Sequence, residues 1–397
     1  MPAIEVLNGN SAAAEAVRQV NPDVAAVYPM IPASEITEKI ASLAADGQID
    51  TEILTVESEH SAMSSCIGAS SAGGRVFTAA AARGLAAEHE TLFIASSLRL
   101  PIVSAVVNGA LSAPLNQNTD HSDSMAERDC GWIQIYSENP QEAYDNIIQA
   151  YKIAEHMEVR VPVMVALDGF VTSHSAENTI IEKGDEVAEF VGKFEPLYSL
   201  LDTDNPKTIG SGTGPDYYFE HKRNQLQGMI NSRKIIKEVG KEFGDRFGRY
   251  YGFFESYKLD DAEFALLLMS SSCGTAKEAI DRLRSRGEKV GLLKLRVFRP
   301  FPVQELKETL AGLKALAVLD RVLTPGSVGG PVFNEIRCAL YDLEKRPRIF
   351  PYVYGLGGRD IRMEHFEEIF ADMREGQTKT AETGAAVRFI NLREEDG

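Results

Sequence analysis

Short apolar runs alternate with stretches of helical periodicity through the first part of the chain, and this alternation constrains the fold more than any other sequence feature. The runs at 24–27, 53–56, 75–78, 102–107, 132–136 and 161–166 are predicted strands. Helices are predicted to begin at an N-cap at Ser34, after Glu59, near Ala86 and near Pro140. Strands that alternate with helices favour a parallel sheet covered on both faces, with sites where the strands end. We therefore expect an α/β fold.

The chain of 397 residues is too long for one ordinary core, so two domains are expected. We assign residues 1–190 to a first α/β domain, 191–255 to a connecting arm, 256–370 to a smaller α/β domain and 371–397 to a polar tail. Predicted strands at 264–269, 290–297 and 316–319 and a predicted helix at 275–285 define the smaller domain. The arm is expected to be ordered, because Tyr217, Tyr218 and Phe219 need a surface to pack against. The tail is expected to wrap a neighbour or fray.

Charge and cysteine content narrow the class of protein. The net charge of −17 disfavours nucleic acid and anionic membranes as partners, because both would repel the chain. No apolar run approaches the roughly 20 residues that span a bilayer, and the N-terminus lacks a basic-then-apolar leader. The four cysteines are far apart and form no C-x-x-C pair, which argues against disulfides, zinc or an iron–sulfur cluster in this chain. We expect a cytoplasmic protein with no metal ligands of its own.

The stretch TVESEHS, which begins at Thr55, places two carboxylates between a predicted strand and a predicted helix. Taken alone, Glu57 and Glu59 are typical of helix N-termini, where the helix dipole favours negative charge. A carboxyl buried at a strand end would instead have a raised proton affinity and suit proton transfer. A glycine-rich run, Gly210–Gly214, is not expected to bind a nucleotide, because no strand precedes it and it is not expected to open a helix directly.

Several motifs occur in an order that carries a resemblance. They are YPMIP at Tyr28, VESEHS at Val56, GL at Gly84, LRLP at Leu98, NGALSAP at Asn108, DHSDSM at Asp120, GW at Gly131, PDYY at Pro215, GTAK at Gly274 and RVFRPFP at Arg296. Together they resemble the alpha subunit of the 2-oxoacid:acceptor oxidoreductases, the multi-subunit pyruvate:ferredoxin oxidoreductase family. The resemblance runs from about residue 8 to about residue 360.

The resemblance implies a fold, a cofactor and partners. The fold is a pyrimidine-type thiamine-diphosphate domain followed by a smaller domain like the C-terminal domain of transketolase. Thiamine diphosphate is shared with a beta subunit that supplies Mg²⁺, and iron–sulfur clusters lie on partner subunits only. The diphosphate signature Gly-Asp-Gly is missing here, since the Gly-Asp pairs at Gly184 and Gly244 lack the second glycine. The implied partners are beta, gamma and ferredoxin-like delta subunits, with a 2-oxoacid and coenzyme A as substrates.

The resemblance also assigns roles to residues. Glu59 aligns with the carboxylate that hydrogen-bonds the cofactor's ring nitrogen N1′, and Glu57 is expected in a salt bridge or subunit contact. Tyr28, Pro29 and Arg83 are the further expected cofactor-binding residues.

Three positions depart from the pyruvate-type pattern. Ile31 stands where that pattern has threonine, Gly109 where it has arginine, and Arg83 lies in an otherwise alanine-rich turn. We expect an apolar pocket with vacated space at Gly109 and with Arg83 as the cation for the substrate carboxylate. Burying a phenyl ring contributes about 2 kcal/mol or more, so a bulky or aromatic acid, phenylglyoxylate first, is favoured. The alternatives are a pyruvate, branched-chain or indolepyruvate oxidoreductase, a non-redox transketolase-type enzyme, or a non-catalytic scaffold.

A polar loop, DHSD, begins at Asp120. Nothing in its spacing specifies a metal site, which would need three or four converging ligands. We expect hydrogen bonds to orient the loop close to the cofactor, with Asp120 and His121 placed at the substrate pocket.

Overall fold

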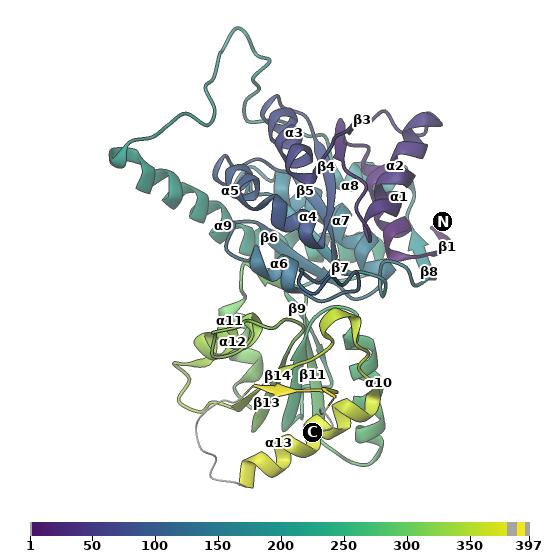
Figure 1. Cartoon of the computed structure of the whole chain (residues 1–397), viewed down its shortest axis with the longest axis vertical. Helices are drawn as coiled ribbons and strands as arrows, with labels where there is room; N and C mark the ends of the chain where they lie inside the picture. Colours follow the sequence, from purple (N-terminus) through teal and green to yellow (C-terminus); the bar gives the residue numbers. More distant parts are fainter. Residues whose placement is uncertain (1, 379–386, 394–397) are drawn as a thin grey trace.

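The computed structural model describes residues 2–378 and 387–393. Figure 1 shows two α/β bodies, the first built from the N-terminal part of the chain and the second from the C-terminal part. The α/β prediction is confirmed, and the predicted strands agree with the observed ones to within one or two residues at most ends. Ser34 is the first residue of its helix and not the N-cap, which is Ala33.

A seven-stranded sheet, in the order β12-β6-β7-β5-β4-β2-β3, forms the centre of the first domain. Its strands are β2 (Val24–Val27), β3 (Glu52–Thr55), β4 (Val76–Ala81), β5 (Val103–Asn108), β6 (Ile133–Ser137), β7 (Val163–Asp168) and β12 (Val297–Arg299). The pairs from β3 to β6 are all parallel, and only β12 runs antiparallel to its neighbour. All carboxyl ends of β2 to β7 therefore meet at one edge.

Helices cover both faces of this sheet. They are α1 (Gly9–Val20), α2 (Ser34–Ala45), α3 (Glu59–Ser71), α4 (Ala82–Ala87), α5 (His89–Ser97), α6 (Ser122–Ala126), α7 (Pro140–Glu155) and α8 (Gly184–Val191). A two-stranded antiparallel sheet joins β1 (Ala3–Leu7) to β8 (Glu177–Ile181) at one side. The region predicted as one helix near Ala86 is two helices, α4 and α5, because the chain turns at Glu88 between them.

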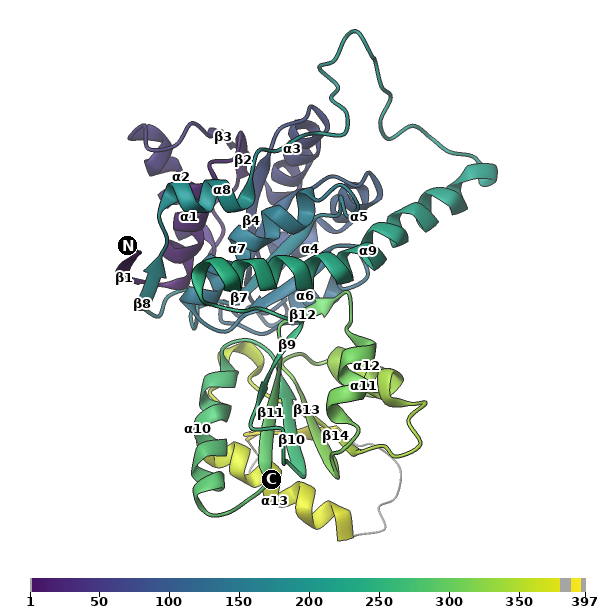
Figure 2. The ribbon, with the colours of Figure 1, turned by 180° about the vertical axis from the view of Figure 1, so that it is seen from behind.

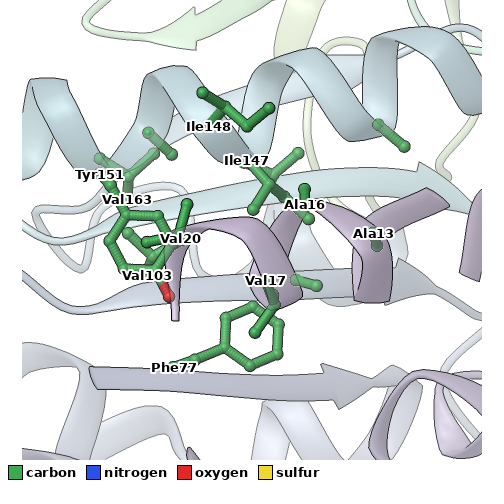
Figure 3. Packing of buried hydrophobic residues seen from close by; sticks show 14 of the residues in the cluster. Ala13, Ala16, Val17, Val20, Phe77, Val103, Ile147, Ile148, Tyr151 and Val163 are labelled. Atoms are coloured by element: carbon green, nitrogen blue, oxygen red, sulfur yellow. The ribbon is translucent and has the colours of Figure 1, made fainter. Parts of the chain in front are cut away.

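Alanines let α1 lie close to α7 and to the sheet. Ala13, Ala16 and Val17 of α1 are fully buried, and Figure 3 shows them between Ile147 of α7 and Phe77 of β4. Small side chains bring two helix backbones close together, and the methyl groups still exclude water. This packing fixes the sheet against its helical layer and so fixes the strand ends that carry the polar clusters.

The expected connecting arm consists of an extended segment, residues 192–214, and a long helix, α9 (Pro215–Phe247). Figure 2 shows α9 crossing the back of the first domain and continuing past its edge, while the extended segment loops outward. The C-terminal half of α9 is anchored through buried Ile235, Ile236 and Phe243. Its N-terminal turn leaves the three aromatic residues Tyr217, Tyr218 and Phe219 exposed, so the described part of the chain does not cover them. Because α9 starts immediately after Gly214, the expectation that the glycine-rich run opens no helix is wrong.

The second domain contains a six-stranded sheet in the order β15-β14-β13-β10-β11-β9. Its elements are β9 (Phe254–Tyr257), β10 (Phe264–Leu268), α10 (Ser272–Ser285), β11 (Val290–Leu295), α11 (Val303–Leu310), β13 (Ala315–Asp320), α12 (Pro331–Leu340), β14 (Arg348–Val353), the short 3₁₀ helix η1 (Leu356–Gly358), α13 (Met363–Thr378) and β15 (Arg388–Phe389). The strands β11, β10, β13, β14 and β15 are parallel, and β9 is antiparallel at the edge.

Several elements depart from the expected domain boundaries. Strand β12, predicted as the end of a second-domain strand, pairs with β6 of the first sheet. Helix α13 runs through the expected boundary at 370, because buried Phe370 and Met373 continue its apolar face. Strand β15 pairs with β14 of its own domain, so this part of the tail neither frays nor wraps a neighbour. The remaining tail, residues 379–386 and 394–397, lies outside the described residues.

A buried carboxylate joins the domains. Asp168, at the end of β7, accepts a hydrogen bond from Arg321 Nη1 of the second domain at 2.8 Å and lies 2.8 Å from His121 Nε2. The backbone N–H of Ser271 donates to the same carboxylate at 3.1 Å. Burial alone would raise the pKa of Asp168, but the Arg321 guanidinium and the His121 ring together hold that pKa well below its usual range.

We expect Asp168→Asn to lower the free energy of unfolding by about 3–5 kcal/mol at pH 7, because it leaves the Arg321 guanidinium buried without its counter-charge. The folded pKa of Asp168 lies below the unfolded value, so its stabilisation is present above about pH 4 and is lost as the pH falls further. Urea unfolding should therefore show a difference in the free energy of unfolding between wild type and variant at pH 7, and this difference should become smaller in acid. Arg362→Gln, at an exposed guanidinium, is the control and should change stability little. An equal effect of both substitutions would contradict the role of Asp168.

Candidate functional site

The candidate site lies at the carboxyl edge of the seven-stranded sheet, where the loops after β2, β3, β4 and β5 meet. The loop after β2 carries Tyr28 to Pro32, and the N-terminus of α3 carries Glu59. The loop after β4 becomes α4, and Gly109 follows β5. Parallel pairing puts all four loops on the same side of the sheet, as the sequence predicts.

Glu59 is buried at the first turn of α3, and its carboxyl is not fully satisfied. Ser58 caps the helix by accepting from the Ser61 N–H at 3.2 Å, which fixes the backbone of the turn. Glu59 is 5% exposed, and its Oε1 atom has no hydrogen-bond partner among the described residues. A Cβ at Gly84 of α4 would lie 1.9 Å from Glu59 Oε1. Only a glycine at that position leaves room for the carboxyl.

The two carboxylates of the motif have opposite environments. Burial raises the pKa of Glu59, and Arg83 partly opposes the shift. Glu57 is exposed and accepts a hydrogen bond from the Ser61 hydroxyl, which lowers its pKa. No salt bridge to Glu57 exists among the residues that the structure describes. The pair therefore divides into one buried carboxyl with raised proton affinity and one solvated carboxylate.

A second buried carboxyl, Glu88, was missed by sequence reasoning. Glu88 is fully buried, and neither of its oxygens has a hydrogen-bond partner among the described residues. Burial raises its pKa well above the usual range, and the nearby charges of Glu59 and Glu127 raise it further. The available signal was its helical spacing, because it falls in line with buried Leu85 and Leu92.

The positions after β4 and β5 lie next to Glu59. Arg83 is exposed and close enough to act on the Glu59 charge. A Cβ at Gly109 would lie 2.9 Å from the Ala82 methyl group, so the position of the first side-chain atom is crowded. The expectation of vacated space farther from the backbone stays a prediction. A longer side chain at this position requires Ala82 to move.

Asp123 holds these two loops together. One carboxylate oxygen accepts from the Ala82 N–H at 3.0 Å and from the Gly109 N–H at 2.9 Å. The other accepts from Asn108 Nδ2 at 2.8 Å and from the Ser124 N–H at 2.7 Å. Burial raises the pKa of Asp123 to about 6, although the hydrogen bonds oppose the shift. Hydrogen bonds thus tie the DHSD segment to the loops after β4 and β5. The expectation that the segment lies close to the cofactor stays a prediction.

The other members of that segment lie at the domain junction. His121 is buried against Asp168, and its backbone N–H donates to Arg321 O at 2.8 Å. Asp120 accepts from the Ser122 N–H at 2.9 Å and from the Gly357 N–H at 3.3 Å. Both side chains are used within the chain, so the structure places them in the junction and not on an open substrate pocket.

The loop after β2 faces solvent. Pro29 is exposed, Tyr28 is partly exposed, and Ile31 is 50% exposed. The loop reaches across the sheet, since a Cβ at Gly169 after β7 would lie 2.7 Å from the Pro32 ring. Ile31 can form a wall of a pocket only when another surface covers it.

One group of carboxylates among the described residues is spaced for a metal ion: Glu138, Glu142 and Glu255. Lys294 Nζ lies 2.6 Å from both Glu138 and Glu142 and 2.7 Å from Glu255. The ammonium group thus takes the place that a cation would occupy. Within the described ranges, the structure contains no helix with the length and apolar character needed to cross a membrane.

Comparison with known families agrees with this geometry. Residues 15–241 match the model of the family described as pyruvate flavodoxin/ferredoxin oxidoreductase, thiamine diphosphate-binding, which is more than half of the chain. The chain belongs to this family. Residues 262–366 match core domain II of pyruvate:ferredoxin oxidoreductase. The chain therefore corresponds to an alpha subunit of the 2-oxoacid:ferredoxin oxidoreductases, as the motifs predict.

Relatives that match over nearly their whole length include proteins with two different names. The chain is 48% identical to pyruvate synthase subunit PorA of Thermotoga maritima over 98% of each chain. It is 44% identical to ketoisovalerate oxidoreductase subunit VorA of Pyrococcus abyssi, over 98% of this chain and 97% of the relative.

Solved structures support the fold. A 2-oxoglutarate:ferredoxin oxidoreductase from Magnetococcus marinus matches with a TM-score of 0.73 at 17% identity, over 93% of this chain and 65% of that chain. A split-gene transketolase matches with a TM-score of 0.54 at 12% identity, over 94% of this chain and 98% of that chain. These likenesses confirm the predicted thiamine-diphosphate fold class.

We expect Gly84→Ala to lower the free energy of unfolding by about 1–3 kcal/mol, because the added methyl group must displace the Glu59 carboxyl. Gly68→Ala is the matched control, since a Cβ at Gly68 of α3 meets nothing within 4 Å. Alanine should stabilise that helix by about 0.5–1 kcal/mol. Urea unfolding of both variants makes the comparison. If Gly84→Ala proves as stable as Gly68→Ala, the carboxyl is not held against Gly84.

Proposed function

We propose that this chain is the alpha subunit of an enzyme that oxidises a 2-oxoacid and coenzyme A to an acyl-CoA and carbon dioxide. The single observation that carries the proposal is the environment of the Glu59 carboxyl, which is buried at the first turn of α3. Its Oε1 atom has no hydrogen-bond partner among the described residues, and a Cβ at Gly84 would clash with that atom. A buried acceptor without a partner costs about 1–3 kcal/mol. Such a cost is expected where a ligand supplies the missing partner.

The aminopyrimidine of thiamine diphosphate fits this carboxyl. Its ring nitrogen N1′ would be the missing partner of Glu59, and the raised pKa of Glu59 suits a group that holds a proton at N1′. Tyr28, Pro29 and Arg83 are the further residues proposed to hold the cofactor. When bound, thiamine diphosphate supplies a carbon nucleophile for the 2-oxo carbonyl. Glu59 would orient the ring and keep its proton, while the buried loops around Gly109 exclude water.

The proposed division of labour needs companion subunits. This chain lacks the Gly-Asp-Gly diphosphate signature, so a beta subunit is proposed to hold the diphosphate through Mg²⁺. Gamma and ferredoxin-like delta subunits are proposed to carry the iron–sulfur clusters that accept the electron pair. Both relatives are named as subunits, which supports an assembly of several chains. A cytoplasmic location is part of the proposal.

For the substrate, the relatives favour pyruvate or the branched 2-oxoisovalerate over phenylglyoxylate. The Ala82 methyl group crowds the Cβ position at Gly109, which gives no support to extra room for a ring next to the carbonyl. Arg83 is proposed to bind the substrate carboxylate. Ile31 is proposed to contact the aliphatic side chain of the substrate once another surface covers it. We therefore propose an aliphatic 2-oxoacid and keep phenylglyoxylate and indolepyruvate as arms of the test.

We expect Glu59→Gln to reduce turnover of the assembled complex by at least about a hundredfold, because an amide cannot hold the required proton. Glu57→Gln is the matched control and should keep most activity, since Glu57 is solvated. Both variants should assemble with their companion chains, as checked by size-exclusion chromatography. Unchanged turnover in Glu59→Gln would favour a scaffold role for this chain.

The substrate is tested by acyl-CoA formation from pyruvate, 2-oxoisovalerate, indolepyruvate and phenylglyoxylate. We expect the two aliphatic acids to have the highest kcat/KM. Gly109→Arg should lose activity on all four, because the new side chain pushes Ala82 away from its place. Adding Ala82→Gly removes that clash and should restore activity preferentially on pyruvate, the smallest acid. A wild type that prefers phenylglyoxylate over both aliphatic acids would overturn the aliphatic assignment.

A further inference from the structure

A cleft of about 730 Å³ lies between the extended segment 192–214, the N-terminal part of α9 and the loop after α5. It opens at the amino-terminal edge of the sheet, since that loop precedes β5, and so it is separate from the Glu59 site. The Gly210–Gly214 run contributes to its wall. Figure 2 shows the extended segment and α9 standing away from the rest of the first domain here.

The charge of this cleft is opposite to that of the whole chain. Its basic lining residues are Arg99, Arg160, Lys207, His221 and Lys222, and none of the described aspartates or glutamates lines it. The chain as a whole carries 58 acidic and 41 basic residues. A cluster of unbalanced cations in an acidic protein favours an anionic occupant.

The cations of the cleft lack carboxylate partners. Arg99 donates to the carbonyl of Val159 at 2.5 Å and to Asn224 Oδ1 at 2.6 Å. Lys222 donates to the Ser97 hydroxyl at 2.7 Å. Among the residues that the structure describes, no carboxylate lies within ion-pair distance of Arg99, Lys207 or Lys222. Their charge is therefore available to another molecule.

Arg160 is the strongest sign of a missing partner. Its side chain is 5% exposed, and its Nε–H has no hydrogen-bond partner within the described part of the chain. Its Nη2 atom donates to Glu195 O at 2.5 Å, and the Phe194 ring lies 5.3 Å from the guanidinium. Burial lowers the pKa of both Arg160 and Arg99 from the ordinary value. The Glu155 carboxylate, which lies beyond ion-pair distance, opposes the shift of Arg160. A carboxylate in direct contact with the guanidinium would stabilise this buried cation further.

The surroundings of the cleft match a protein partner better than a small ligand. Leu197 and Leu201 of the extended segment are 65% and 76% exposed, and Phe219 of α9 is 79% exposed. A second hollow of about 460 Å³ lies on α9 next to the cleft. Asn224 lines both, and Phe219 lines the second hollow. Exposed apolar area that extends beyond one cavity marks a protein interface.

We propose that this cleft is a docking site for a segment of a companion subunit that presents aspartate or glutamate side chains among aliphatic or aromatic residues. The carboxylates meet Arg99, Arg160, Lys207 and Lys222, and the apolar residues cover the exposed leucines and Phe219. The inference rests on the proposed multi-subunit assembly, and it adds the surface and the chemistry of the contact. A small anion such as a nucleotide is the competing occupant.

The test is zero-length cross-linking of the intact complex, purified through a tag on this chain. A carbodiimide joins an amine to a carboxylate only where the two are in contact. We expect amide links from Lys207 or Lys222 to an aspartate or glutamate of a companion chain, identified by mass spectrometry. Lys207→Arg with Lys222→Arg should keep the assembly and lose the links, because a guanidinium forms no such amide. Links confined to this chain, or none in an intact complex, would overturn the proposal.

A charge-removal variant gives the second measurement. Lys207→Gln with Lys222→Gln should weaken retention of companion subunits about tenfold in moderate salt. Lys234→Gln with Lys241→Gln removes the same charge from exposed positions on α9 outside the cleft and should have no effect. Equal retention of companion subunits by both variants would count against the proposal. Binding of ADP or coenzyme A to the isolated chain would also count against it, if the cleft variant lost that binding and the control variant kept it. Detecting cross-links does not require enzyme activity. A complex that is cross-linked but inactive would therefore refute the proposed function and leave the docking proposal standing.

Discussion

The contact between Asp168 and Arg321 is the interaction on which the arrangement of the two domains depends. Asp168 ends β7, an interior strand of the first sheet, so its position is set by the core of the first domain. It engages Arg321, Ser271 and His121 at once, and the His121 backbone returns to Arg321. A buried carboxylate with this many donors is rigid, because no alternative geometry satisfies all of them. The junction therefore fixes the DHSD segment and, through Asp123, the loops at the candidate site.

The site itself contains a contrast between satisfied and unsatisfied acids. Asp123 accepts four hydrogen bonds and organises the backbone of Ala82 and Gly109. Glu59 and Glu88 are buried with unpaired oxygens, and their proximity disfavours ionisation of both together. Asp123 fixes the loops around the site through its hydrogen bonds. Burying Glu59 and Glu88 without partners costs free energy, and the surrounding packed structure offsets that cost. Such a cost at a strand end is what a cofactor site requires.

Two separate surfaces of this chain are incomplete in isolation. At one edge of the sheet, Ile31 and Arg83 are exposed beside the buried Glu59 carboxyl, whose Oε1 atom has no hydrogen-bond partner among the described residues. At the other edge, the cleft under the extended segment holds cations with no carboxylate among its described lining residues, next to exposed leucines. Both surfaces are built from loops at strand and helix ends, where backbone geometry leaves polar groups to be met by another molecule. The hydrophobic cores thus stabilise the fold, and the two sheet edges leave surfaces that another molecule can bind.

Local pattern was enough to predict much of this protein. Apolar periodicity located the strands, and the order of motifs identified the family and the Glu57–Glu59 pair, because these signals lie within short windows of sequence. Only the tertiary structure showed which of the two glutamates is buried, because Gly84 and Arg83 come from a different strand end. Glu88, Arg321 and the transfer of β12 to the first sheet escaped prediction for the same reason. Burial and charge pairing depend on residues far apart in the chain, and no single stretch of sequence contains that information.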